Sequence, residues 1–264
     1  MIQPSMENFF NYDTMQFQMV SHILTFGFAV MLAALFYFVM TIKSVAKRFR
    51  ISSVLSVVVM VSAFLILYFQ AASWQNAFTF NSSSGLYQPR DGYTFTNGYR
   101  YLNWLIDVPM LLYQILFIID LEAVRRNSLR NQFFFSGCAL IILGYIGQFY
   151  ETSNLTYLWI YGLVSTAFFF HVIYLIYKVI SSSYSYLTPP AKKYMSSIWW
   201  LFLISWWLYP VAYIMPVFFN TAWGAVTRQL LFTGADIASK VIYGIFLTQV
   251  AMIRTKDENL EVGG

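Results

Sequence analysis

Apolar residues form seven long stretches along this chain, and short polar segments separate them. The stretches are Met19–Ile42, Ile51–Ser73, Tyr99–Ile119, Phe133–Tyr150, Leu155–Ile180, Ile198–Phe219 and Thr227–Ile253. Each is long enough for a helix that crosses ~30 Å of hydrocarbon at about 1.5 Å per residue. The pattern predicts an all-α membrane protein, a seven-transmembrane-helix bundle that forms one domain over residues 1–264.

Composition supports a membrane location. Of the 264 residues, 59% are hydrophobic and 10% are charged, whereas ordinary soluble domains carry about 25% charged residues. One soluble core cannot bury so much apolar surface, so the lipid bilayer is the expected solvent. We expect a multi-pass protein of the cell (plasma) membrane, here a bacterial inner membrane, and no nucleic-acid partner.

The distribution of Lys and Arg predicts the orientation. These residues gather in the connections after the first, third and fifth stretches and in the C-terminal tail. The other side holds only Arg90, Arg100 and Arg228. Because positive residues favour the cytoplasmic side, we expect the N-terminus outside, with 1–18 as an extracellular segment, and 254–264 as a cytoplasmic tail. We expect no cleavable signal peptide.

Two extracellular features are also predicted. The longest connection, 74–98, contains Thr79-Phe80-Asn81 and Tyr93-Thr94-Phe95 among Gly, Ser and Asn, a pattern consistent with a short hairpin. The segment from Met6 to Gln18 is predicted to form a small helix that caps the outer end of the bundle.

Three ionisable residues lie in the middle of predicted spans, namely Asp107, Asp236 and Lys240. Each costs at least ~2.5–3.5 kcal/mol to insert, so each requires a reason. Asp236 and Lys240 are four residues apart and share one helix face. In one interpretation they form a structural ion pair. In the other, Lys240 condenses with an aldehyde cofactor to a protonated imine, whose charge the two carboxylates stabilise.

The third stretch also carries a polar stripe. Arg100, Asn103, Asp107 and Gln114 advance by three, four and seven residues, so they lie on one side of a helix. We expect that side to point into the bundle.

Three segments resemble the microbial rhodopsins. Arg100–Pro109 reads RYLNWLIDVP, similar to the Arg-Tyr-x-Asp-Trp-x-x-Thr-x-Pro segment of that family. Asp236–Lys240 reads DIASK and resembles the Asp-x-x-x-Lys retinal anchor. Trp206–Tyr213 reads WWLYPVAY and resembles the Trp-x-x-Tyr-Pro pocket segment. The resemblance implies one retinal-binding domain, a photoreceptor chromophore of all-trans retinal bound covalently to Lys240, and light-driven ion transport rather than an enzyme activity.

The resemblance also assigns roles to individual residues. It makes Asp107 the main counterion, and it pairs Arg100 with Asp236 as an outer barrier to cations. The implied cofactor-binding residues, besides Lys240, are Trp104, Leu111, Trp206, Tyr209, Tyr213 and Ser239.

The triplet Asn103, Asp107 and Gln114 stands where proton pumps of the family usually have Asp, Thr and a carboxylate. It resembles the light-driven sodium-pumping rhodopsins. That likeness implies outward sodium transport, in which Asp107 takes a proton transiently and sodium then passes Asn103 and Asp236, where it binds transiently. A fixed charge at Asp107 disfavours chloride. The chain departs from the sodium pumps at Ser52-Ser53, where Asn is typical. Both residue types offer oxygen ligands, so the difference predicts ion uptake with altered selectivity.

The remaining polar residues outline an ion pathway. Ser56 and Gln114 are expected at the cytoplasmic entry. Glu7, Glu151 and Arg228 form either an outer release cluster or ordinary interface charge. The full set of pathway residues is Ser53, Ser56, Ser62, Gln70, Glu7, Glu151 and Arg228.

Several alternatives stay open at this point. The closest is an outward proton pump, either exclusively or when sodium is scarce. A photosensor that signals to a partner and a transporter without retinal are the others. The family resemblance also implies a homo-oligomer, and we expect a pentamer rather than a trimer.

Overall fold

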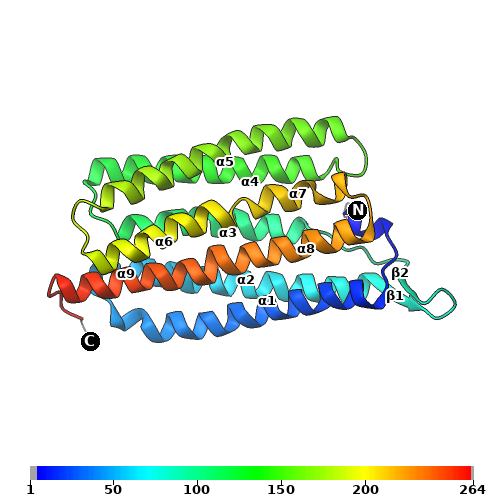
Figure 1. Cartoon of the computed structure of the whole chain (residues 1–264), viewed down its shortest axis with the longest axis horizontal. Coiled ribbons are helices and arrows are strands. Elements are labelled where there is room, and N and C mark those ends of the chain that lie inside the picture. Colours follow the sequence, from blue (N-terminus) through cyan, green and yellow to red (C-terminus); the bar gives the residue numbers. More distant parts are fainter. Residues whose placement is uncertain (1–4, 263–264) are drawn as a thin grey trace.

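The structure is a computed structural model that describes residues 5–262. Seven helical rods run side by side, with a small hairpin at one end of the bundle and the end of α9 at the other (Figure 1). The first five rods are α1 (Thr14–Thr41), α2 (Arg50–Ala77), α3 (Gly98–Gln114), α4 (Ala123–Gln148) and α5 (Leu155–Ser183). The sixth rod consists of α6 (Pro189–Ser205) and α7 (Leu208–Phe218). The seventh consists of α8 (Ala222–Asp236), a π-helical segment (Ile237–Ile242) and α9 (Tyr243–Asp257). The predicted seven-helix all-α fold is confirmed.

Several helices begin before the apolar stretch that predicted them. The first begins at Thr14 rather than Met19, because Asp13 and Gln16 form a capping box. The Gln16 N–H donates to Asp13 Oδ1 (2.8 Å), and the Asp13 N–H donates to Gln16 Oε1 (2.9 Å). Likewise the sixth rod begins at Pro189 rather than Ile198, since proline suits the first turn of a helix. Hydropathy marks only the apolar part of such helices.

Six of the rods are long and apolar enough to cross a membrane. The remaining rod is α3, which has 17 residues and carries Arg100 and Asp107 in its buried face. The sixth rod is interrupted after Ser205, and Pro210 accounts for this because it has no N–H to donate to the carbonyl of Trp206. Which end of the bundle faces the cytoplasm remains a prediction.

Two predictions about the connection 74–98 differ from the structure. Strand β1 (Phe78–Asn81) lies where we expected a strand, but its antiparallel partner is β2 (Leu86–Pro89) and not Tyr93–Phe95. The turn between the strands uses Gly85 at φ 70°, a conformation that glycine adopts readily. The predicted connection 74–98 is also shorter, because α2 continues to Ala77.

The predicted helix from Met6 to Gln18 is wrong. A short 3-10 helix covers Met6–Phe9, and α1 starts after Asp13. Between them Tyr12 joins the hairpin, because its N–H and carbonyl bond Tyr87 at 2.9 and 2.8 Å. The predicted tail 254–264 begins inside α9. Residues 1–4 and 263–264 of the two predicted terminal segments lie outside the described residues.

Candidate functional site

Lys240 lies in the π-helical segment of the seventh rod, and its side chain is 1% exposed. Its Nζ donates to Asp236 Oδ1 (2.5 Å) and to Asn103 Oδ1 (3.1 Å), and it lies 3.6 Å from Asp107 Oδ2. Two carboxylates and one amide oxygen therefore surround a buried amine. The inward polar stripe predicted on α3 is confirmed, because Arg100, Asn103, Asp107 and Gln114 are all buried.

Arg100 completes a balanced group of charges. Its Nη1 donates to Asp236 Oδ2 at 3.0 Å, so the predicted pair is confirmed. Its Nη2 donates to Gln229 Oε1 (3.2 Å) and Thr233 Oγ1 (2.9 Å). Two cations, Lys240 and Arg100, thus stand among two carboxylates away from water. A buried group of this kind is tolerated when its charges are paired and hydrogen-bonded.

Asp236 and Asp107 have different surroundings. Besides the two cations, Asp236 accepts from the Trp104 indole N–H and from the Tyr209 hydroxyl, both at 2.9 Å. Asp107 accepts no hydrogen bond from any residue between 5 and 262. Asp236 is therefore fixed by four donors, whereas Asp107 faces the amine with spare acceptor capacity.

The pathway residues on α2 lie along α3. Ser62 Oγ accepts from Asn103 Nδ2 at 2.7 Å, and Ser56 Oγ donates to Gln114 Oε1 at 3.2 Å. Ser53 is buried one turn before Ser56. Gln70 is fully buried in the half of α2 nearer the hairpin, and its amide has no hydrogen-bond partner in the described part of the chain. The structure therefore brings Ser56 and Ser62 to the α3 stripe by hydrogen bonds, whereas Gln70 forms no such bond to it within the described residues.

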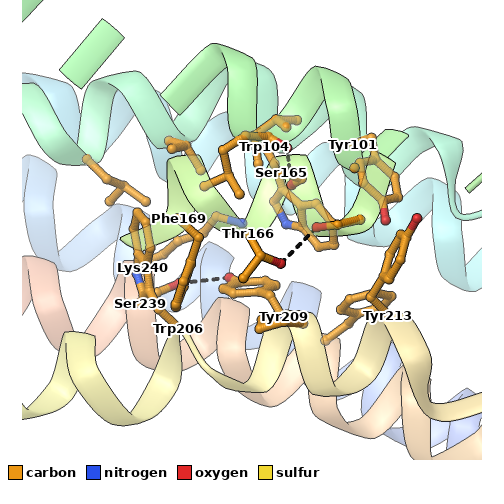
Figure 2. A pocket seen from close by; sticks show the side chains of 18 residues that line it. Tyr101, Trp104, Ser165, Thr166, Phe169, Trp206, Tyr209, Tyr213, Ser239 and Lys240 are labelled. Carbon is orange, nitrogen blue, oxygen red and sulfur yellow. Dashed lines mark hydrogen bonds between the residues drawn. The ribbon is translucent and has the colours of Figure 1, made fainter. Parts of the chain in front are cut away.

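A cavity of about 90 Å³ opens beside Lys240, and its walls are mostly apolar, as those of small-molecule sites usually are. Figure 2 shows Trp206, Ser239 and Lys240 toward one end, Tyr213 and Tyr101 toward the other, and Tyr209 between them. All six predicted retinal-pocket residues line it, namely Trp104, Leu111, Trp206, Tyr209, Tyr213 and Ser239.

The cavity fits a flat, apolar aldehyde attached to Lys240. Its walls are mainly aromatic and aliphatic, and they provide faces for stacking a conjugated chain. Glycines keep the far end open, since a Cβ at Gly162 would lie 3.2 Å from Tyr213 Cε1. The indole N–H of Trp206 has no acceptor among the described residues. The amine at one end is the only part of the lining that can form an imine bond.

The sequence analysis missed the α4 and α5 side of this cavity. Gly144, Gly162, Ser165, Thr166 and Phe169 line it, and none of them has an ionisable side chain that would mark it as a site residue. Gln229 and Thr233 were also missed, although a signal existed. With Asp236 and Lys240 they recur at intervals of four, three and four residues, which is one face of a helix.

Glu7, Glu151 and Arg228 form one buried cluster at the hairpin end. Arg228 donates from Nε to Glu7 Oε1 (2.8 Å), from Nη1 to Glu151 Oε2 (2.6 Å), and from Nη2 to Glu7 Oε2. Burial opposes ionisation of Glu7, but the field and hydrogen bonds of Arg228 hold its pKa below the ordinary value. For Glu151 burial prevails over Arg228 and raises the pKa. These three charges are therefore not exposed interface charges.

Gln229 links this cluster to the lysine site, because it donates from Nε2 to Glu7 (2.7 Å) and to Asn97 (2.9 Å) while accepting from Arg100. No group of three or more His, Cys, Asp or Glu side chains suited to a metal ion occurs within residues 5–262. The two oxygens predicted to hold sodium, on Asn103 and Asp236, both contact Lys240 Nζ.

The family model of bacteriorhodopsin-like proteins matches residues 18–253. This chain belongs to that family. Members of this microbial rhodopsin family hold retinal as a Schiff base on a lysine. Membership therefore makes retinal the cofactor and disfavours a transporter without it.

Two solved rhodopsins match over almost the whole length. Xanthorhodopsin, described as a light-driven ion pump with a dual chromophore, is 27% identical, with a TM-score of 0.85 over 95% of this chain and 99% of its own. A thermophilic rhodopsin is 25% identical, with a TM-score of 0.88 and the same coverage. The chain therefore shares the rhodopsin fold over 95% of its length.

Curated relatives match over shorter alignments. Green-light absorbing proteorhodopsin from Gamma-proteobacterium EBAC31A08 is 21% identical over 155 residues, 58% of this chain and 61% of its own. Archaerhodopsin-3 from Halorubrum sodomense is 26% identical over 148 residues, 56% of this chain and 55% of its own. The chain thus spans less than two thirds of the length of these relatives.

Proposed function

We propose that this protein is a light-driven pump that carries retinal on Lys240 and moves sodium ions outward. One observation carries the proposal. The Lys240 amine opens onto an aromatic cavity while Asn103, Asp107 and Asp236 surround it with oxygen atoms.

Retinal, when bound to Lys240, supplies light absorption and a change of shape upon illumination. The proton on Lys240 Nζ then has Asp107 as its acceptor, 3.6 Å away and free of other hydrogen bonds within the described residues. Transfer of that proton makes both groups neutral, so a passing cation no longer meets a fixed positive charge. Return of the proton to Nζ restores the charge and opposes backflow.

The oxygens of Asn103 and Asp236 support transient binding of sodium. Both already converge on one cation, the Lys240 ammonium, at 3.1 and 2.5 Å. Hard cations prefer oxygen ligands of this type. Beyond them Arg100 obstructs the route toward the hairpin end, and the Glu7–Glu151–Arg228 cluster is the proposed release region.

The residues at the proposed cytoplasmic entry, Ser56 and Gln114, favour sodium over protons as the transported ion. Gln114 and Ser56 bond each other there and neither can act as an acid near neutral pH. A proton pump needs a donor that reprotonates the lysine from the entry side, and Gln114 occupies the third position of the triplet where a carboxylate serves that purpose.

The proton remains the second candidate ion. The comparisons favour it, because proteorhodopsin and archaerhodopsin-3 are among the relatives and neither they nor xanthorhodopsin is described as a sodium pump. Ser53, which replaces the Asn typical of sodium pumps, also leaves the selectivity to experiment.

Illuminated vesicles distinguish the two ions. The external pH is followed in sodium and then in potassium medium, with and without a protonophore. A sodium pump gives passive proton influx that the protonophore enhances, and only in sodium. Light-driven acidification that the protonophore abolishes in sodium medium would replace the sodium assignment with the proton. A visible band that persists in Lys240→Ala would remove the retinal assignment itself.

We also propose that the N-terminus is outside the cell, in a bacterial inner membrane, and that five copies assemble. Protease accessibility of tags at the two ends of the chain tests the orientation. Light scattering of the purified protein tests the pentamer, and a monomer mass would reject it.

A further inference from the structure

The C-terminal end of the bundle holds a second cavity, separate from the one beside Lys240. We infer that Phe49 is a gate between this cavity and the polar pathway on α2 and α3, and that Arg48 and Arg254 hold it shut. The inference rests on the proposed ion transport and adds the entry point and the residues that control it.

The second cavity is a vestibule of about 390 Å³ between the start of α2 and the connection from α3 to α4. Its lining includes Phe49, Phe117, Asp120, Glu122 and Arg126. The two acids offer carboxylate oxygens to an arriving cation, and the neighbouring arginines weaken that attraction. Entry sites of pathways need this balance, because the ion must bind and then leave.

Phe49 lies between the vestibule and the polar pathway. Its side chain is 1% exposed and lines the vestibule. Ser53 follows one turn later on α2, and Gln114 precedes Phe117 by three residues on the other wall. A helical turn rises about 5.4 Å. The hydrogen-bonded pair of Ser56 and Gln114 therefore lies about two turns beyond Phe49 on α2 and about one turn before Phe117 on the other wall.

Two guanidinium groups hold the ring of Phe49. The central carbon of Arg48 lies 4.6 Å from the ring centroid, and that of Arg254 lies 5.1 Å from it. Both distances allow cation–π attraction. Arg48 lies beside Phe49 in the short 3-10 helix Lys47–Phe49 that precedes α2, so the ring is fixed by this segment and the end of α9 together.

Arg254 is itself held firmly. Only 3% of it is exposed. Its Nη2 donates to Asp120 Oδ2 (2.5 Å), its Nε to Glu258 Oε1 (2.7 Å), and its Nη1 to the carbonyl of Ile118. It lies on the same helical rod as Lys240, 14 residues further on. A displacement of that rod would pull Arg254 away from Phe49 and also remove a buried positive charge that repels arriving cations.

Chemical accessibility of position 53 tests the gate. In the holoprotein with Cys138→Ser and Ser53→Cys, the single thiol lies behind Phe49. Its rate of reaction with 2-aminoethyl methanethiosulfonate is measured in the dark in lipid nanodiscs. Adding Arg254→Gln should raise that rate at least tenfold. Adding Arg125→Gln, the same charge change at an exposed site on α4, should leave it unchanged.

Phe49→Ala provides a second route to the open state without loss of a charge, and the visible band reports that each variant is folded. Equal rates in Phe49→Ala, Arg254→Gln and Arg125→Gln would overturn the gate. A thiol at position 53 that already reacts as fast as one at the exposed Asn127→Cys would do the same.

The reaction of the thiol does not depend on which ion the protein moves. A protein that pumps only protons, yet shows the tenfold increase, would reject sodium and keep the gate. Sodium pumping with no increase would reject the gate alone.

Discussion

Replacing Arg228 with glutamine should be one of the most destabilising single changes at the hairpin end. Arg228 is the only cation that contacts Glu7 and Glu151 in the described chain, and all three side chains are buried. Removing one partner of a buried ion pair costs about 3–5 kcal/mol, because the remaining charge stays away from water. Stability totals only about 5–15 kcal/mol, so Arg228→Gln removes a large share of it.

The pH dependence of this cost has a definite sign. The pKa of Glu7 is lowered, so its contribution to stability is present above its ordinary pKa of 4.5 and is lost as the pH falls through the lowered value. The pKa of Glu151 is raised, so its contribution is present below 4.5 and is lost as the pH rises through the raised value. Glu7→Gln should therefore weaken the loss of stability in acid, and Glu151→Gln should weaken the loss on the alkaline side of pH 4.5.

Equilibrium unfolding in mixed micelles of increasing SDS content, followed by tryptophan fluorescence, measures these differences. The control is Arg90→Gln, which removes the same charge from an exposed residue whose guanidinium lies over the ring of Tyr93. Its expected cost is within about 0.5 kcal/mol. If Arg228→Gln and Arg90→Gln unfold within 1 kcal/mol of each other (about a fivefold difference in equilibrium constant), the cluster does not stabilise the fold as argued.

Three further predictions concern glycines and the counterion. Gly224→Ala should lower the free energy of unfolding by at least about 2 kcal/mol, because the new Cβ would lie 1.9 Å from the carbonyl oxygen of Phe219. The Cβ of Gly234→Ala meets nothing within 4 Å, so this change should raise the free energy of unfolding by about 0.5–1 kcal/mol. Equal unfolding midpoints of the two variants would contradict both. Gly162→Phe should fill the far end of the cavity and slow formation of the visible band with added all-trans retinal at least tenfold; an unchanged rate would place retinal elsewhere. Asp107→Asn should shift that band to longer wavelength and stop transport, whereas an unchanged colour would exclude its counterion role.

The fold could be predicted because the bilayer requires it. Apolar stretches of spanning length and the alternation of Lys and Arg suffice to indicate seven helices. The polar residues of α3 and the pair Asp236 and Lys240 could also be placed, since helical spacing determines which side chains share a face. The first residues of the helices were harder to predict from the sequence, because a capping box at Asp13 or a proline at Pro189 extends a helix beyond its apolar part.

Contacts and cavities formed by residues far apart in the chain could be found only in the tertiary structure. Glu7 and Arg228 are 221 residues apart and still share two hydrogen bonds. The contact of Arg254 with the ring of Phe49 likewise joins α9 to the segment before α2, and the retinal cavity depends on unremarkable residues such as Gly162 on α5. A sequence determines which residues share a helix face, because backbone geometry is local. Which faces meet, and what space they leave, depends on how seven rods pack together.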